Sequence, residues 1–275
     1  MNNQTKKELL TIAVEAALNA GKIVNKVYNG ADFEVEQKED ETPLTLADRK
    51  SHDIIKSHLD KTDYPQLSEE GKDISYKDRK DWEYFWLIDP LDGTKEFIKK
   101  NGEFTVNIAL VHNGNPVMGV VYAPHVGDLY FGDESFGAYK IENFNGKEDT
   151  FSDLNDLMKE GTILPKSEHR KKLVVVASRS HMNDDTQTYI DKLKKKHGEV
   201  DFISKGSSLK ICMIAEGKAD VYPRFAPTME WDTAAGHAVA ISAGFHVTEK
   251  DEKTPLQYNK ENLTNPWFIV KRENV

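Results

Sequence analysis

The sequence predicts a mixed α/β (α+β) fold that is built in two parts. In the first part, two segments with helical periodicity precede a run of strand segments joined by short turns. In the second part, short β-branched strands alternate with helices, as in sheets with crossover helices. A polar, poorly periodic stretch at 143–172 separates the two. We therefore expect an N-terminal domain over residues 1–165 and a C-terminal domain over residues 166–275.

Helical spacing dominates the first sixty residues. Apolar side chains recur every three or four positions from Leu9 to Val27, and Asn29-Gly30 ends this helix. A second helix follows Thr45 and continues to Leu59. The charged run from Lys72 to Asp81 is expected to be an exposed excursion before the first long strand.

Strand segments fill the rest of the first part, and Asn113-Gly114 between two of them is a strong hairpin signal. The expected strands begin at Trp86 and continue at Phe104–His112, Val117–Tyr122 and Leu129–Phe131.

The second part alternates between strands and helices. Its expected strands are Leu173–Ala177, Val200–Ile203, Ala219–Tyr222 and Trp267–Val270. Its expected helices are Asp184–His197, Ser208–Ala215 and Thr233–Ala243.

Composition narrows the class of protein. Apolar residues make up 38% and charged residues 30%, which is typical of a folded globular chain, and no apolar run is long enough to cross a bilayer. The net charge of -9 argues against binding of a nucleic-acid polymer. An anionic substrate would need local cations: metal ions, Lys or Arg. The single cysteine, Cys212, excludes an intrachain disulfide and is expected to be a buried structural thiol. A cytoplasmic location is therefore expected, with peripheral association with the inner membrane left open.

The segment Asp89-Pro90-Leu91-Asp92-Gly93-Thr94 carries the strongest chemical signal. It follows an apolar strand and opens a helix, so two carboxylates and the Leu91 carbonyl could hold hard cations while the helix start holds a phosphate. This combination indicates a metal-dependent phosphatase. The plain alternative is that Asp-Pro and Asp-Gly are ordinary turn dipeptides.

A second competitor is the haloacid dehalogenase type of phosphatase, which has Asp-x-Asp-x-Thr after a strand and a nucleophilic first Asp. In this chain two residues separate Asp89 from Asp92. The spacing therefore favours metal ligation over a covalent route.

Two further acidic segments are ambiguous by themselves. Thr45 followed by Asp48 reads as a capping box in which Asp replaces the usual Glu, and that interpretation is favoured for the pair alone. Glu69-Glu70 reads as solvated surface.

Considered together, these segments resemble a known family. Asp89–Thr94 and Trp231-Asp232-Thr233-Ala234-Ala235-Gly236 resemble the paired signature of the inositol monophosphatase superfamily, and Thr45-x-x-Asp48 and Glu69-Glu70 stand where that family has its earlier motifs. The resemblance covers nearly the whole chain. Within the superfamily the second half is most similar to the CysQ-like 3′(2′),5′-bisphosphate nucleotidases, through Ser178-Arg179-Ser180-His181, Gly206–Lys210, Tyr222–Phe225 and Glu230–His237.

The resemblance implies a fold and a set of site residues. The fold is a layered α-β-α-β-α sandwich of the inositol monophosphatase and fructose-1,6-bisphosphatase type. Two or three Mg²⁺ ions would be held by Glu69 (favoured over Glu70), Asp89, Asp92, Asp232 and the Leu91 carbonyl. Asp48 and Thr94 would activate the attacking water. The substrate would be bound by Gly93, Thr94, His181, Ser207, Lys210, Arg224 and Asp232.

The activity implied by the resemblance is Mg²⁺-dependent hydrolysis of adenosine 3′,5′-bisphosphate to AMP and phosphate. Action on the sulfated analogue, a place in sulfur assimilation and nucleotide metabolism, and inhibition by lithium are also implied. The partner is then a small nucleotide bisphosphate, and the protein is a monomer or a homodimer. The alternatives are an inositol monophosphatase, and a non-catalytic protein that binds metal or nucleotide on a retained fold.

Overall fold

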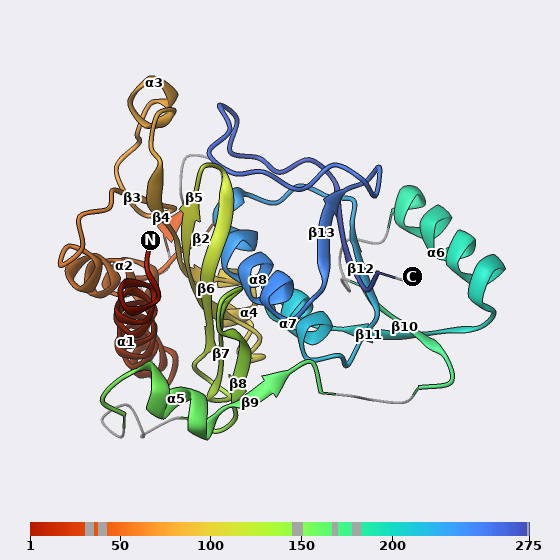
Figure 1. Ribbon diagram of the computed structural model, residues 1–275, viewed down its shortest axis with the longest axis horizontal. Coiled ribbons are helices and arrows are strands. Elements are labelled where there is room, and N and C mark those ends of the chain that lie inside the picture. The colour runs from red at the N-terminus through yellow and green to blue at the C-terminus, as the bar shows by residue number, and fades with distance from the viewer. Residues whose placement is uncertain (31–35, 38–42, 145–150, 167–169, 178–182, 274) are drawn as a thin grey trace.

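Helices and sheets alternate as five layers in the computed structural model (Figure 1). The structure describes residues 1–275 except 31–35, 38–42, 145–150, 167–169, 178–182 and 274. Helices α1 (Asn3–Tyr28), α2 (Leu46–Leu59) and α5 (Leu154–Glu160) form one outer layer, and α6 (Asp184–His197) forms the other. Helices α7 (Leu209–Ala215) and α8 (Glu230–Ser242) lie between two sheets. The expected α-β-α-β-α order is confirmed. None of the helices within the described ranges is long and apolar enough to cross a membrane.

The first sheet has seven strands in the order β3-β4-β5-β6-β7-β8-β9, and only β3 and β4 run parallel. The strands are β3 (Gln66–Ser68), β4 (Tyr84–Asp92), β5 (Thr105–His112), β6 (Asn115–Ala123), β7 (Asp128–Asp133), β8 (Gly137–Ile141) and β9 (Thr162–Leu164). The register between β4 and β5 shifts between Asp89 and Asp92. This irregularity accommodates Pro90, which has no N–H to donate to the hydrogen-bond ladder between the two strands. It also changes the direction in which the carboxylates of Asp89 and Asp92 point.

The second sheet has five strands in the order β11-β10-β12-β14-β13, with β10 parallel to both of its neighbours. The strands are β10 (Leu173–Ala177), β11 (Val200–Ser204), β12 (Val221–Arg224), β13 (His246–Glu249) and β14 (Phe268–Lys271). The remaining elements are short: β1 (Glu36–Gln37), β2 (Pro43–Leu44), α3 (Tyr76–Arg79) and α4 (Thr94–Ile98).

Small residues allow α8 to lie directly on the first sheet. Gly119 of β6 faces α8 so closely that an added Cβ would be 2.3 Å from the Ala235 carbonyl oxygen and 2.9 Å from the Ala238 Cβ. Because Asp232 is in the first turn of α8, this close seating brings its carboxylate to the end of β4. The sheet–helix contact therefore assembles the site.

We expect Gly119→Ala to lower the free energy of unfolding by about 1–3 kcal/mol, because the new methyl group overpacks a backbone contact that cannot yield. For a protein of this size the melting temperature should fall by about 2–4 °C per kcal/mol. Thermal unfolding of Gly137→Ala is the comparison, since a Cβ at 137 meets nothing within 4 Å and reports only the strain of φ 83°. Equal melting temperatures for Gly119→Ala and the unmodified protein would contradict the close contact.

Two expectations need correction or completion. The run from Lys72 to Asp81 is not wholly an exposed excursion: it contains α3, and Arg79 is buried. The Arg79 guanidinium donates to Asn259 Oδ1 (2.8 Å) and to the Glu261 carbonyl (3.1 Å), so a distant loop supplies acceptors for two of its three nitrogens. Cys212 is buried as expected.

The division between residues 165 and 166 follows the last strand of the first sheet. It stays a prediction, because helix α8 of the second part packs on that same sheet.

Candidate active site

Helix α2 presents Asp48 from its first turn toward the end of β4. Asp48 Oδ2 accepts from the Thr45 N–H (2.8 Å) and the Thr45 hydroxyl (2.5 Å), so the expected capping box is present. The other oxygen, Oδ1, lies 3.3 Å from the Thr94 hydroxyl. One carboxylate therefore both caps the helix and contacts Thr94. Burial raises the pKa of Asp48 to about 6, although the hydrogen bonds from Thr45 act in the opposite direction.

The turn after β4 places Thr94 between two acceptors. Its hydroxyl is 3.3 Å from Asp48 Oδ1 and 3.3 Å from the Leu91 carbonyl, and a single proton can serve only one of them at a time. Gly93 precedes it with φ 93°, a left-handed conformation that glycine adopts without a steric penalty. The chain can therefore turn from β4 into α4 within one residue.

Three carboxylates meet beside this turn: Glu69 from the turn after β3, Asp89 from β4 and Asp232 from α8. Oxygen atoms of Glu69, Asp89 and Asp232 all lie within 4.8 Å of one another, and Glu70 is not part of this group. Burial raises the pKa of Asp89 and of Asp232, and repulsion from the neighbouring acids raises both further. Closely spaced carboxylate oxygens suit a hard divalent cation, so the residues present fit Mg²⁺.

Asp92 lies beside this group and contributes to the repulsion at Asp89 and Asp232. Its Oδ2 accepts from the Ser208 N–H at 2.6 Å, and the Asn107 amide nitrogen is 3.5 Å away. Burial raises the pKa of Asp92, while the positive charge of Lys210 lowers it. Asp92 thus connects the acidic group to a neighbouring cationic pocket.

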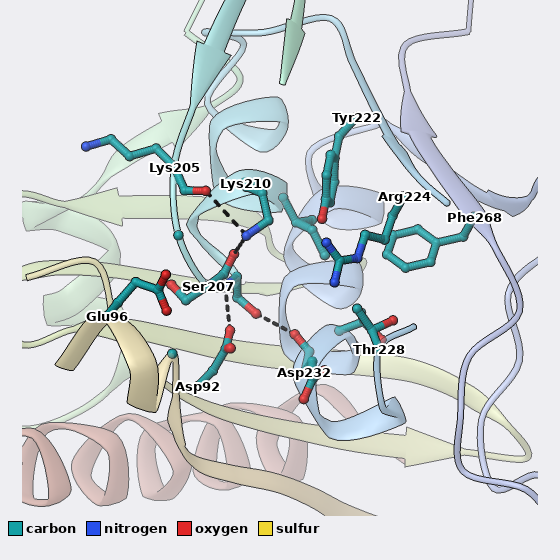
Figure 2. Close-up of a pocket in the computed structure, with 15 residues that line it drawn as sticks. Asp92, Glu96, Lys205, Ser207, Lys210, Tyr222, Arg224, Thr228, Asp232 and Phe268 are labelled. Carbon is teal, nitrogen blue, oxygen red and sulfur yellow. Dashed lines mark hydrogen bonds between the residues drawn. The ribbon is translucent and has the colours of Figure 1, made fainter. Parts of the chain in front are cut away.

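That pocket opens between α4, the loop before α7, β12 and the start of α8 (Figure 2). Its polar lining includes Asp92, Glu96, Ser207, Lys210, Arg224 and Asp232. Figure 2 shows the charged ends of Lys210 and Arg224 turned toward the same space as Asp232. Acidic groups that suit cations and basic groups that suit an anion therefore share one cavity wall.

The cationic side of the pocket has donors that the protein does not fully use. Lys210 Nζ donates to the Ser207 carbonyl at 2.7 Å and contacts the Lys205 carbonyl at 3.4 Å, and burial lowers the pKa of Lys210 to about 8. Arg224 Nη2 donates to the Pro227 carbonyl (3.0 Å), but its buried Nε has no partner among the described residues. The Ser207 hydroxyl is likewise buried without a described partner.

Ser207 also has strained backbone, with φ 46° in a residue that is not glycine. Such strain costs about 1–3 kcal/mol and is concentrated at functional sites, where surrounding contacts maintain it. Unused donors and local strain in the same pocket both indicate a ligand-binding surface.

The structure brings together the candidate residues that lie within its described ranges. The exception is His181, which belongs to 178–182 and lies outside the described residues, as does the Ser178–His181 segment that resembles the nucleotidase motif. Reasoning from the sequence gave no site role to Asn107, Ser208 or Glu96, although Ser208 lies in the Gly206–Lys210 segment that resembles the nucleotidases. The sequence does contain one signal for Asn107: it is the single amide in the otherwise apolar run from Val106 to Val111.

Comparison with known proteins agrees with this architecture. The model of the Inositol monophosphatase family matches residues 5–271. The 3′(2′),5′-bisphosphate nucleotidase CysQ of Salmonella typhimurium is 44% identical over 265 residues, which cover 95% of this chain and 99% of that protein. The corresponding CysQ of Escherichia coli strain K12 is 44% identical over 266 residues, with coverage of 95% and 99%.

Solved structures give the same result. The crystal structure of CysQ from Bacteroides thetaiotaomicron superposes with a TM-score of 0.92 at 53% identity and covers 98% of this chain and 99% of that one. The extragenic suppressor protein suhB from Bartonella henselae has a TM-score of 0.70 at 26% identity, with coverage of 95% and 92%. These matches cover nearly the whole chain, including both sheets, and the chain belongs to the inositol monophosphatase family.

Proposed function

We propose that this chain is a Mg²⁺-dependent 3′(2′),5′-bisphosphate nucleotidase that hydrolyses adenosine 3′,5′-bisphosphate to AMP and phosphate. The observation that carries the proposal is that the acidic group adjoins the Lys210–Arg224 pocket: Asp232 belongs to both, and Asp92, which lies beside the acidic group, also lines the pocket. A substrate with two phosphates fits this arrangement, because one phosphate can meet cations at the carboxylates while the other meets Lys and Arg. The CysQ relatives, which carry the nucleotidase name, support the same substrate class.

The acidic residues supply the metal ligands. Glu69, Asp89, Asp92 and Asp232, with the Leu91 carbonyl, would hold two or three Mg²⁺ ions. When bound, Mg²⁺ would lower the pKa of water and neutralise charge that develops on the phosphoryl oxygens. The repulsion among these closely spaced carboxylates is then relieved, so metal binding should also stabilise the folded protein.

Thr94 and Asp48 would move the proton from the attacking water. The Thr94 hydroxyl can pass its own proton to Asp48 Oδ1 at 3.3 Å while it accepts one from the water. The new bond joins the water oxygen to phosphorus, and the bond from phosphorus to the 3′-oxygen breaks. The 3′-oxygen leaves with that electron pair and takes a proton from solvent to become the hydroxyl of AMP, and Asp48 releases its proton to solvent. Asp48 must be ionised at the start, and at neutral pH it is, because its pKa is about 6.

Ser207, Lys210 and Arg224 would bind the phosphate that does not react. Among the described residues, the Arg224 Nε and the Ser207 hydroxyl have no hydrogen-bond partner, so both are available to this phosphate. The planar fork of an Arg side chain also suits a phosphate. Gly93 and Thr94 would donate their backbone N–H groups to the reacting phosphate. His181 remains our prediction for a contact with the nucleoside part of the substrate.

The test of the substrate is a comparison of phosphate release with Mg²⁺ from adenosine 3′,5′-bisphosphate and from inositol 1-phosphate. We expect a clear preference for the nucleotide, activity on its sulfated analogue and inhibition by lithium. Preference for the inositol ester would favour the alternative of an inositol monophosphatase. Binding of the nucleotide without turnover of either ester would favour a non-catalytic protein.

The proposal also includes a small-molecule partner, a cytoplasmic location, and a monomeric or homodimeric state.

We expect Lys210→Ala to lower kcat/KM for the bisphosphate by about 10- to 100-fold, since a hydrogen bond to a charged group contributes about 1.5–3 kcal/mol. A monophosphate that lacks the second phosphate should lose much less. The control is Lys205→Ala at the rim of the pocket, whose Nζ lies 3.6 Å from Glu103 Oε1 and is partly exposed. Equal losses on both substrates would instead assign Lys210 to holding the Lys205 and Ser207 carbonyls.

A further inference from the structure

We propose that Ser208 and Asn107 form a positioning pair that fixes Asp92 relative to the first turn of α8, and so sets the affinity of the site for Mg²⁺. The inference rests on the proposed function for the use of the cation. It concerns two residues that hold the metal ligands without contacting the substrate's reacting atoms.

Ser208 connects both aspartates that line the pocket. Its N–H donates to Asp92 Oδ2 at 2.6 Å, and its hydroxyl donates to the Asp232 carbonyl at 2.5 Å. Figure 2 shows these two bonds as dashed lines that reach Asp92 and Asp232 from the chain between Ser207 and Lys210. One buried residue therefore bonds to the end of β4 and to the first turn of α8, elements that come from different parts of the chain.

Asn107 completes the network from β5. Its amide nitrogen lies 3.1 Å from the Ser208 hydroxyl oxygen and 3.5 Å from Asp92 Oδ2. The single hydroxyl proton of Ser208 already goes to the Asp232 carbonyl, and an ionised carboxylate only accepts. The NH₂ group of Asn107 must therefore face both, so the contacts themselves define the orientation of the amide.

The position of Asn107 is costly for the fold. It is fully buried in a central strand, opposite Asp89 in the pairing of β4 with β5, and its neighbours along β5 are apolar. The oxygen of its side-chain amide, Oδ1, has no hydrogen-bond partner among the described residues. A buried polar group that is only partly bonded destabilises a strand relative to an apolar side chain. The contacts of its nitrogen to Ser208 and Asp92 are what an apolar residue could not supply.

The consequence for metal binding follows from which oxygen is occupied. Ser208 and Asn107 hold Oδ2 of Asp92, which leaves Oδ1 for a cation and limits rotation of the carboxylate. Groups that orient metal ligands in this way typically change metal affinity by about 10- to 100-fold when they are removed. We expect a loss of this size for Ser208→Ala, which keeps the N–H bond to Asp92 but releases Asp232 and Asn107.

The experiment is calorimetric titration of each variant with Mg²⁺ in the absence of substrate. Ser208→Ala and Asn107→Ala should each weaken Mg²⁺ binding by about 10- to 100-fold. The double variant should lose less than the product of the two, because both changes break the same hydrogen bond. Ser204→Ala is the matched control, since it removes a buried hydroxyl four residues earlier that has no described partner, and its Mg²⁺ affinity should be unchanged.

A purely structural role would lower the melting temperature of the metal-free protein and leave the Mg²⁺ affinity of the folded fraction unchanged. That result for both single variants would overturn the proposal. Ser208→Thr, which keeps a hydroxyl, should restore most of the affinity; if Ser208→Ala fails to fold, a wild-type affinity in Asn107→Ala alone would overturn it. The titration contains no substrate, so its result does not depend on the nucleotide assignment. Failure of that assignment would appear in the separate phosphate-release assay, as a wild-type protein that binds Mg²⁺ and does not release phosphate from the bisphosphate.

Discussion

Asp92→Asn is expected to lower kcat for phosphate release by about three orders of magnitude, with little change in the fold. Metal ligation supplies several kcal/mol of charge stabilisation in the transition state, and each 1.36 kcal/mol corresponds to about a tenfold change in rate. Asn has the shape of Asp and can still accept from the Ser208 N–H through its own oxygen. The amide NH₂ then occupies the position of the second carboxylate oxygen, where it repels a cation.

The same substitution should leave the metal-free protein as stable as before, or more stable. Burial raises the pKa of Asp92, and its charge raises the pKa of Asp89 and Asp232, so the ionised form is unfavourable without cations. The melting temperature of the unmodified protein should rise with added Mg²⁺, and that of the variant should not.

The control is Asp73→Asn, which neutralises an exposed acid outside the site and should preserve both kcat and the Mg²⁺-dependent rise in melting temperature. An Asp92→Asn variant with unmodified turnover would contradict the assignment of Asp92 as a metal ligand.

Local signals in the sequence predicted much of the fold. Residues Asp184–His197 and Leu173–Ala177 have the predicted bounds, because strong helical or β-branched patterns and clear end signals determine them locally. Strands β8, β9 and β13 were missed, since their short segments become strands only through pairing with neighbours. The burial of Arg79 was missed for the same reason, because its partners lie far along the chain.

The site shows the same division between local and distant determinants. The spacing from Asp89 to Thr94 indicates metal ligation by itself, whereas the approach of Asp232 depends on how α8 lies on the sheet. The capping pair illustrates a further difficulty. Sequence alone favoured capping for Asp48, and the structure shows that its two oxygens allow capping and contact with Thr94 together.

Asp48→Asn is the second change with a large expected effect. Removal of a general base typically lowers turnover by about 10²- to 10⁴-fold, and an amide cannot take the proton that Thr94 releases. Mg²⁺ affinity should be nearly unchanged, since Asp48 is not among the proposed ligands. Asp53→Asn, which alters an exposed acid on the same helix, should retain full activity and serves as the control.

The pH dependence follows from the raised pKa of Asp48. Burial moves it to about 6, so the ionised form that accepts from Thr94 predominates above pH 6 and is lost as the pH falls below it. At a fixed low Mg²⁺ concentration, kcat/KM should therefore decrease about tenfold per pH unit on the acid side. Bound cations favour the ionised carboxylate, so higher Mg²⁺ should move the inflection to lower pH.

The sign for stability is the opposite of the sign for activity. The unfolded chain ionises this carboxyl near its ordinary pKa of 3.8, whereas the folded protein retains the proton up to about pH 6. The contribution of the protonated form to stability is therefore present below pH 3.8 and is lost as the pH rises to about 6. Measured between pH 4 and 7 without metal, the loss of stability should be smaller in Asp48→Asn than in the unmodified protein, because only Asp89, Asp92 and Asp232 then contribute to it. The acid limb of the activity profile should be absent in this variant. An acid limb that persists unchanged in the residual activity of Asp48→Asn would assign the titration to another group and would remove Asp48 from the proton path.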